Sequence, residues 1–141
     1  MNKRELRNRL TLLIVLTISW SVIAAQTSPG QAGPQAIPVI DGGIGPCSAD
    51  FTVNDAAGVP VYAAKIKVHI AYGFMNARKL DLEVGTNSEG KARFVGLPDH
   101  LKRGLYFEAS EGDRTATAFD SPANACKAQF TVTLRKKSET P

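Results

Sequence analysis

Apolar side chains recur at every second position in this chain, and that period decides what the chain can fold into. Residues 64–70 are apolar at each even position and polar at each odd position, and residues 126–134 repeat this alternation over five apolar positions. Such alternation predicts β-strands with one face buried and the other in water. After residue 25, no segment shows the period of an amphipathic helix. The sequence therefore predicts an all-β fold.

Turn-forming residues divide the alternating region into seven short strands. They are expected at 49–53, 64–70, 79–84, 91–95, 105–109, 115–119 and 126–134. Seven short strands separated by turns are typical of an antiparallel β-sandwich, and a small closed barrel is the alternative architecture.

The second and third of these strands are expected to form a hairpin. In that pairing His69 faces Asp81 and Lys67 faces Glu83, both on the solvent side. Each exposed pair of opposite charges contributes at most about 1 kcal/mol. The pairs therefore select the register of the hairpin more than they add to its stability.

The first 25 residues have the pattern of a secretory signal. Residues 1–9 carry four basic side chains and one acidic side chain, and residues 10–25 are uncharged and largely apolar, ending in Ala24 and Ala25. This pattern predicts a signal peptide over residues 1–25 that is cleaved after Ala24 or Ala25, with a retained membrane anchor as the alternative. We expect a secreted or periplasmic protein of the cell envelope that meets the membrane only transiently, through its export signal.

Most of the positive charge of the chain belongs to that signal. The whole sequence has 17 Lys and Arg residues against 13 Asp and Glu residues, a net charge of +4. Residues 1–25 hold four of the basic residues and one of the acidic ones, which leaves 13 against 12 in the exported part. A charge near +1 does not indicate a nucleic-acid partner.

The next segment, residues 26–46, has the composition of a flexible linker. It contains four Pro and five Gly in 21 positions and shows no apolar period. Such a composition favours an extended, mobile tether. The folded domain is then expected at 47–137, followed by a disordered tail at 138–141.

The two cysteines are predicted to form a disulfide. Cys47 is in phase with the inward positions of the first strand, and Cys126 begins the inward row of the last strand. The first and last strands of a sandwich commonly lie close together, and disulfides persist in exported proteins. The alternative is a pair of free, buried thiols.

The sequence contains no common motif of catalysis or of cofactor binding. It has no GxSxG, no HExxH and no GxxxxGK followed by Ser or Thr. Cys47, His69, His100 and Cys126 lie far apart, without CxxC or HxxxH spacing, which excludes a zinc finger. We expect no cofactor and no metal.

The connection at residues 71–78 is unusually apolar for a hairpin loop. It places Tyr72, Phe74 and Met75 where the chain must turn, with Arg78 beside them. One interpretation is that these side chains fold back and close the open end of the sandwich. The other is a contact patch for a protein, a glycan or a membrane surface, because aromatic, Met and Arg side chains are typical interface anchors.

Several motifs in residues 49–134 resemble those of a known family. They are F-x-V-x-D-x-x-G-x-P-V at 51–61, the alternation at 64–68, Thr86–Gly90 before Phe94, Leu97-Pro98, and Gly104-Leu105-Tyr106. Together they resemble the carboxypeptidase regulatory-like domain of the transthyretin-like, or prealbumin-like, β-sandwich group. The resemblance implies an Ig-like or transthyretin-like sandwich that serves as a non-catalytic accessory or binding module. In the strand expected at 105–109, which begins within this last motif, we expect Leu105, Phe107 and Ala109 to point inward, since the other register would bury Glu108.

An enzyme of the same general fold is the competing interpretation. Hydroxyisourate hydrolases of the transthyretin-like group carry a terminal Tyr-Arg-Gly-Ser, and this chain lacks that motif. Asp81 and Glu83 share a face, as a glycosidase pair does, but Lys67 and His69 account for them as cross-strand partners. We expect an exported, non-catalytic module that binds a protein or glycan partner or serves a structural role. The alternative is a small secreted hydrolase that uses the loop around His100.

Overall fold

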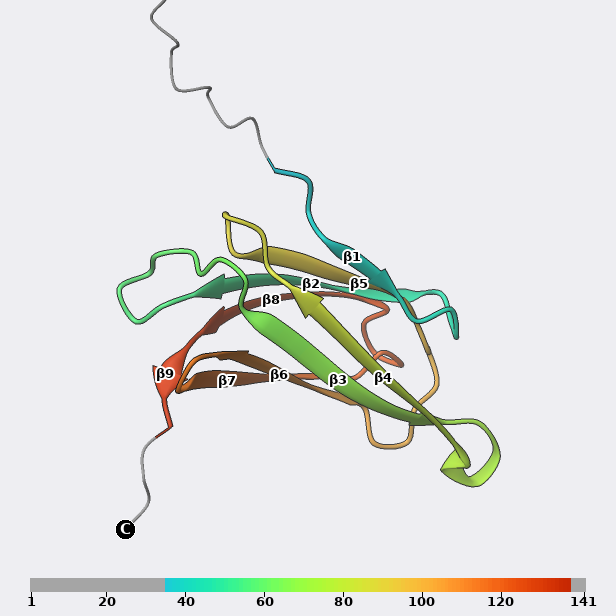
Figure 1. Ribbon diagram of the computed structural model, residues 1–141. Helices are drawn as coiled ribbons and strands as arrows, with labels where there is room; N and C mark the ends of the chain where they lie inside the picture. The colour runs from blue at the N-terminus through green and yellow to red at the C-terminus, as the bar shows by residue number, and fades with distance from the viewer. Residues whose placement is uncertain (1–34, 138–141) are drawn as a thin grey trace, which may run out of the picture. The chain divides into compact units, whose positions relative to one another are not determined.

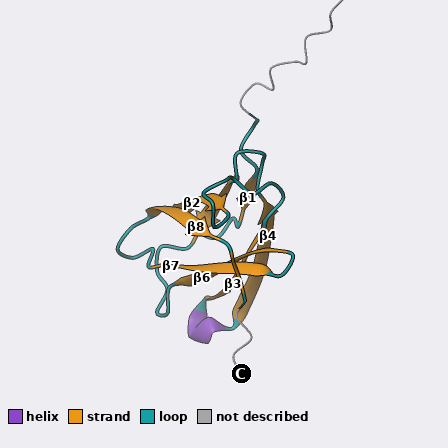
Figure 2. Ribbon diagram, turned by 90° about the vertical axis from the view of Figure 1, so that its left-hand side faces the viewer, coloured by secondary structure: helices purple, strands orange, loops and turns teal. Residues whose placement is uncertain are grey.

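The alternating strands assemble into two sheets that pack face to face, as the computed structural model of residues 35–137 shows (Figures 1 and 2). One sheet has the strand order β1-β5-β2-β8 and the other has the order β4-β3-β6-β7-β9. The elements are β1 (Val39–Asp41), β2 (Cys47–Asn54), β3 (Lys65–Tyr72), the single-turn helix η1 (Phe74–Asn76), β4 (Arg78–Gly85), β5 (Lys91–Leu97), β6 (Leu105–Glu111), β7 (Arg114–Asp120), β8 (Lys127–Thr133) and β9 (Arg135–Lys136). The prediction of a β-sandwich is therefore confirmed. The predicted signal peptide, the first part of the predicted linker and the predicted tail lie outside the described residues.

Two features of the predicted topology are wrong. The described residues form nine strands where seven are predicted, and two strand pairs, β1 with β5 and β2 with β8, are parallel. A short turn imposes antiparallel pairing only on the two strands that it joins. Five strands separate β2 from β8 in the sequence, so no short turn joins the two strands. Their relative direction is therefore not restricted by a turn, and they pair in parallel.

The end of the predicted linker is also ordered. Val39–Asp41 forms β1 and pairs with residues 93–95 of β5, while Ile40 and Ile44 pack against the core. The free edge of β5 supplies backbone partners, and the apolar side chains gain burial, which together outweigh the preference of Pro and Gly for irregular structure. The linker prediction for residues 26–46 is therefore wrong over residues 39–41.

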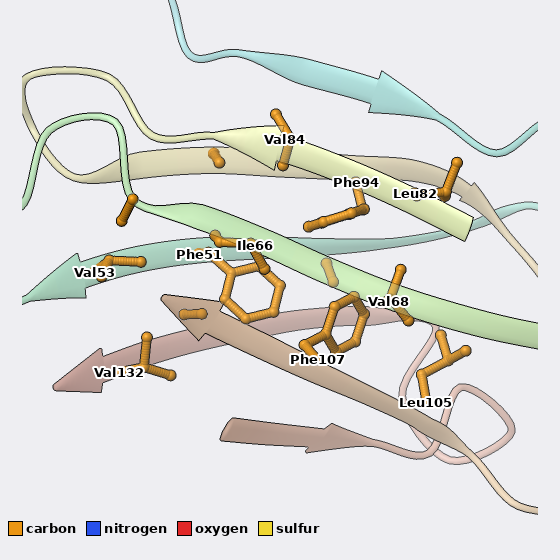
Figure 3. Packing of buried hydrophobic residues seen from close by; sticks show 14 of the residues in the cluster. Phe51, Val53, Ile66, Val68, Leu82, Val84, Phe94, Leu105, Phe107 and Val132 are labelled. Atoms are coloured by element: carbon orange, nitrogen blue, oxygen red, sulfur yellow. The ribbon is translucent and has the colours of Figure 1, made fainter. Parts of the chain in front are cut away.

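A cluster of aromatic rings holds the two sheets together (Figure 3). Phe51 of β2 is 2% exposed, and its ring centroid lies 4.9 Å from that of Phe107 in the opposite sheet. It also lies 5.8 Å from Phe94 and 5.1 Å from Phe130 in its own sheet. The inward prediction for β6 is confirmed, since its buried positions include Phe107 and exclude Glu108.

The hairpin of β3 and β4 has the predicted register. His69 pairs with Asp81 and Lys67 pairs with Glu83. The Nδ1 atom of His69 lies 2.5 Å from Asp81 Oδ1, and the Nζ atoms of Lys65 and Lys67 each lie 3.2 Å from a carboxylate oxygen of Glu83. Matching charges across the strands therefore accompany the register that buries the apolar row.

The predicted disulfide between Cys47 and Cys126 is present, with a Cα–Cα distance of 4.6 Å. It links the start of β2 to the segment just before β8, where Ser48 N–H also donates to the Cys126 carbonyl at 2.8 Å. Cys47 is buried, whereas Cys126 is exposed and does not belong to the inward row predicted for the last strand. Ala128, Phe130, Val132 and Leu134 do face the core.

Replacing both cysteines, Cys47→Ala with Cys126→Ala, should lower the free energy of unfolding by about 4 kcal/mol in the chain-entropy model, because the bond closes a long loop in the unfolded chain. Urea unfolding measures the change, and the wild-type protein under reducing conditions should show the same loss. Unchanged stability, or two reactive thiols per chain in the denatured, unreduced wild type, would contradict this expectation.

Glu83→Gln should flatten the dependence of stability on pH in acid. Hydrogen bonds from Lys65 and Lys67 lower the pKa of Glu83 below its ordinary value of 4.5, so the folded state holds the proton less tightly than the unfolded state. The stabilising contribution is present above about pH 4.5 and is lost as the pH falls through the lowered folded pKa. Urea unfolding at about pH 5 and about pH 3 should differ less for the variant than for the wild type.

The matched control for that measurement is Glu108→Gln. Glu108 lies on the same face of the same sheet, and among the described residues it forms no ion pair. An equal flattening in both variants would contradict the role of Glu83.

Candidate functional site

The turn between β3 and β4 carries two large apolar side chains into solvent. Phe74 and Met75, here called the hairpin tip, lie in η1 and are 88% and 84% exposed. Figure 1 shows the turn beyond the strands of both sheets, at one end of the sandwich. Of the two interpretations of this loop, folding back over the core holds for Tyr72, which packs against the core, and does not hold for the exposed hairpin tip.

A strained backbone holds the hairpin tip in this position. Met75 and Asn76 have φ angles of 53° and 56°, in the left-handed region that costs energy for a residue with a side chain, and Gly73 has a φ of 79°. Two hydrogen bonds close the turn, from Asn76 N–H to the Gly73 carbonyl at 3.1 Å and from Ala77 N–H to the Phe74 carbonyl at 3.2 Å. The turn therefore combines backbone strain with apolar exposure, and neither contributes to folding. Such combinations are concentrated at functional sites.

Sequence reasoning missed a pair of exposed aromatic residues on the outer face of the five-stranded sheet. Tyr106 of β6 and Phe119 of β7, here called the aromatic pair, are cross-strand partners with ring centroids 4.7 Å apart. They are 68% and 50% exposed. The sequence does contain a signal for their exposure. Both residues alternate with the inward-facing positions of their strands, so their side chains are on the outer face.

Tyr106 of the aromatic pair borders a shallow hollow with polar walls. The hollow has a volume of about 530 Å³, and its lining includes Tyr106, His69, Asp81 and Glu108. An aromatic ring beside hydrogen-bonding groups is suited to stacking against a flat ligand such as a sugar ring. The sheet face is therefore a second candidate contact surface.

Neither histidine lies in the constellation that nucleophilic catalysis needs. His69 contacts Asp81, and His100 is 88% exposed with its Nε2 atom 3.4 Å from Asp99 Oδ2. Across residues 35–137, no hydroxyl or thiol group forms a hydrogen bond with either imidazole. Within the same residues, no three His, Cys, Asp or Glu side chains lie close enough together to hold a metal ion.

Asp120 is a buried acid that sequence reasoning did not single out. It ends β7, is 5% exposed, and has no hydrogen-bond partner for its Oδ2 atom. Burial raises the pKa of its carboxyl group, and a hydrogen bond from the Ser121 backbone opposes that rise. Its neighbour across the strands is Leu105, so it lies at the end of the sandwich that also carries the hairpin tip.

The part of the chain that the structure describes contains no helix that is long and apolar enough to cross a bilayer.

Comparisons with known proteins leave the family of this chain open. No protein-family model matches it, and no curated protein matches it. Solved structures with a partial likeness include 3-chlorocatechol 1,2-dioxygenase from Rhodococcus opacus 1CP, with 15% identity and a TM-score of 0.45 over 72% of this chain and 64% of that chain. Chlorocatechol 1,2-dioxygenase from Pseudomonas putida is 11% identical, with a TM-score of 0.45 over 74% of this chain and 69% of that chain. The chain thus spans less than two thirds of the Rhodococcus protein, and a likeness of this degree assigns neither a family nor an activity.

Removing the hairpin tip should leave the fold intact. Phe74→Ser combined with Met75→Asn, here called the tip variant, should change the free energy of unfolding by no more than about 0.5 kcal/mol, because both side chains are exposed and Asn tolerates the left-handed backbone. Tyr72→Ser, which removes a ring packed against the core, should cost about 1 kcal/mol or more. Thermal unfolding followed by circular dichroism measures both. A larger loss in the tip variant than in Tyr72→Ser would show that the tip supports the fold.

Proposed function

We propose that this chain is an exported, non-catalytic binding module of the cell envelope that contacts its partner through the hairpin tip. The observation that carries the proposal is the exposure of Phe74 and Met75 on a strained turn at one end of a disulfide-bonded sandwich. Exposed apolar anchors on a rigid scaffold lose little conformational entropy when they bind. The fold therefore supports binding through this turn.

Three further observations support export and a non-catalytic role. The pattern of residues 1–25 is that of a secretory signal. The disulfide between Cys47 and Cys126 is typical of oxidising compartments. The imidazole of His100, on which the hydrolase alternative depends, extends into solvent, away from any positioned nucleophile among the described residues.

Binding of the labelled, exported protein to the isolated envelope fraction of its native source tests this function. The tip variant should bind at least about tenfold more weakly, because it loses the apolar anchors while it keeps its fold. Val59→Ser with Tyr62→Ser is the matched control, since it removes two exposed apolar side chains from the connection between β2 and β3, at the other end of the sandwich. The control should bind as the wild type does.

Two outcomes, one from this binding experiment and one from an activity assay, would contradict the proposal. If Tyr106→Ala with Phe119→Ala abolishes binding while the tip variant retains it, the contact lies on the sheet face. Turnover of a panel of ester, amide and glycoside substrates that His100→Ala abolishes would favour the hydrolase.

A further inference from the structure

Four basic side chains lie at the end of the sandwich that carries the hairpin tip. Arg78 and Lys79 begin β4, directly after the turn, and Lys102 and Arg103 lie in the connection between β5 and β6. We call these four residues the basic collar. The register of the strands places both segments at the same end, because β6 begins beside the end of β3.

A common hollow joins the two halves of the basic collar to the turn. It has a volume of about 480 Å³, and its lining includes Lys79, Lys102, Arg103 and Asn76 of η1. Positive charge from two separate segments therefore gathers beside the hairpin tip.

No carboxylate among residues 35–137 forms an ion pair with the basic collar. By contrast, six of the nine other Lys and Arg side chains there do form such pairs: Lys65, Lys67, Lys91, Arg93, Arg114 and Lys136. Asp99, the acid in the connection between β5 and β6, lies 3.4 Å from His100. Asp120 at this end is buried, and the exposed Asp41 accepts a hydrogen bond from the Gly43 backbone. The charges of the collar are thus available to an external partner.

We infer that the hairpin tip and the basic collar together dock on an anionic lipid surface. Phe74 and Met75 enter the headgroup region, and the collar contacts lipid phosphates around them. Apolar side chains projecting from a ring of Lys and Arg side chains match the two layers of a bilayer interface, apolar below and anionic above. This inference rests on the proposed function and names the partner of the same site.

The shape of the site favours a membrane over a folded protein. A large side chain buries about 200 Å², so two of them supply about half of the roughly 800 Å² that each partner contributes to a stable protein complex. A bilayer has no such requirement, because the apolar side chains insert into it and the charges act along its surface. A small convex tip beside cations that form no ion pair within residues 35–137 therefore fits a bilayer better.

The path of the chain is compatible with this docking. Residue Gln35 meets the sandwich beside Asn87 and Ser88, with hydrogen bonds of 3.2 Å and 3.3 Å. These residues follow β4, at the end opposite the hairpin tip. In the docked protein the chain therefore enters the sandwich on the side that faces away from the lipid.

Vesicle binding of the exported protein tests the inference. The probes are vesicles of phosphatidylcholine alone and vesicles with about one third phosphatidylglycerol, and flotation measures the bound fraction. The wild type should bind the anionic vesicles at least about tenfold more tightly, with binding that weakens as salt is added. The tip variant should lose about tenfold, and so should Lys102→Ser with Arg103→Ser.

The matched control for charge is Arg135→Ser with Lys137→Ser. It removes the same charge from residues in and beside β9, which pairs with the start of β7 at the other end of the sandwich. This control should keep full binding. An equal loss in both charge variants would show attraction by overall charge and would overturn the docking site.

Insertion has its own readout. The single tryptophan of the sequence, Trp20, lies in the predicted signal peptide, so Phe74→Trp provides the only tryptophan of the exported protein. Its emission should shift to shorter wavelength on anionic vesicles, and the emission of Tyr62→Trp, which is exposed at the other end, should not. Equal shifts for both reporters would contradict insertion through the tip.

The outcomes separate this inference from the proposed function. If the wild type ignores both kinds of vesicle while the tip variant still loses binding to the envelope fraction, the partner is a protein or a glycan and only the lipid inference fails. If the tip variant matches the wild type in both assays, the proposed function fails as well.

Discussion

Burial of one aromatic ring between two sheets is the interaction on which the rest of this structure depends. Phe51 packs against Phe107 from the opposite sheet and against two further rings of its own sheet. Each of these rings occupies the inward phase of an alternating strand, so the contact also sets which face of each strand meets water. The outer faces are then free to carry charge and exposed aromatic groups without cost to the core.

The separation of a packed interior from solvent-exposed outer surfaces explains how the chain tolerates an unfavourable turn. The hairpin tip adds nothing to the apolar cluster, and its backbone stores strain at Met75. The β3–β4 ladder anchors the turn on one side of the molecule through eight paired positions, and the disulfide braces the neighbouring loops at the same end. Stability generated in the interior therefore supports an exposed, strained contact site at the periphery.

The charged side chains of the described residues differ in whether they form ion pairs. Where the strands carry charge along their outer faces, ion pairs such as Arg93 with Asp50 and Lys67 with Glu83 neutralise it. At the end with the hairpin tip, the collar residues remain without carboxylate partners among residues 35–137. An unpaired cation contributes little to folding but attracts an anionic partner over about a Debye length, so its value lies in association.

The sequence by itself determined the parts that depend on local period and on register. Alternation assigned the faces of β3 and β6, and matching charges placed His69 opposite Asp81. The inward phase of Cys47 and the expected export predicted the bond to Cys126, although Cys126 itself is exposed. Tertiary structure alone decided the parallel pairing of β2 with β8, the ordering of β1, the exposure of the hairpin tip and the approach of Lys102 and Arg103 to it. A side chain's face repeats along its own strand and can be read there, whereas strand order, edge pairing and the meeting of distant loops depend on which surfaces remain unburied once the sheets have packed.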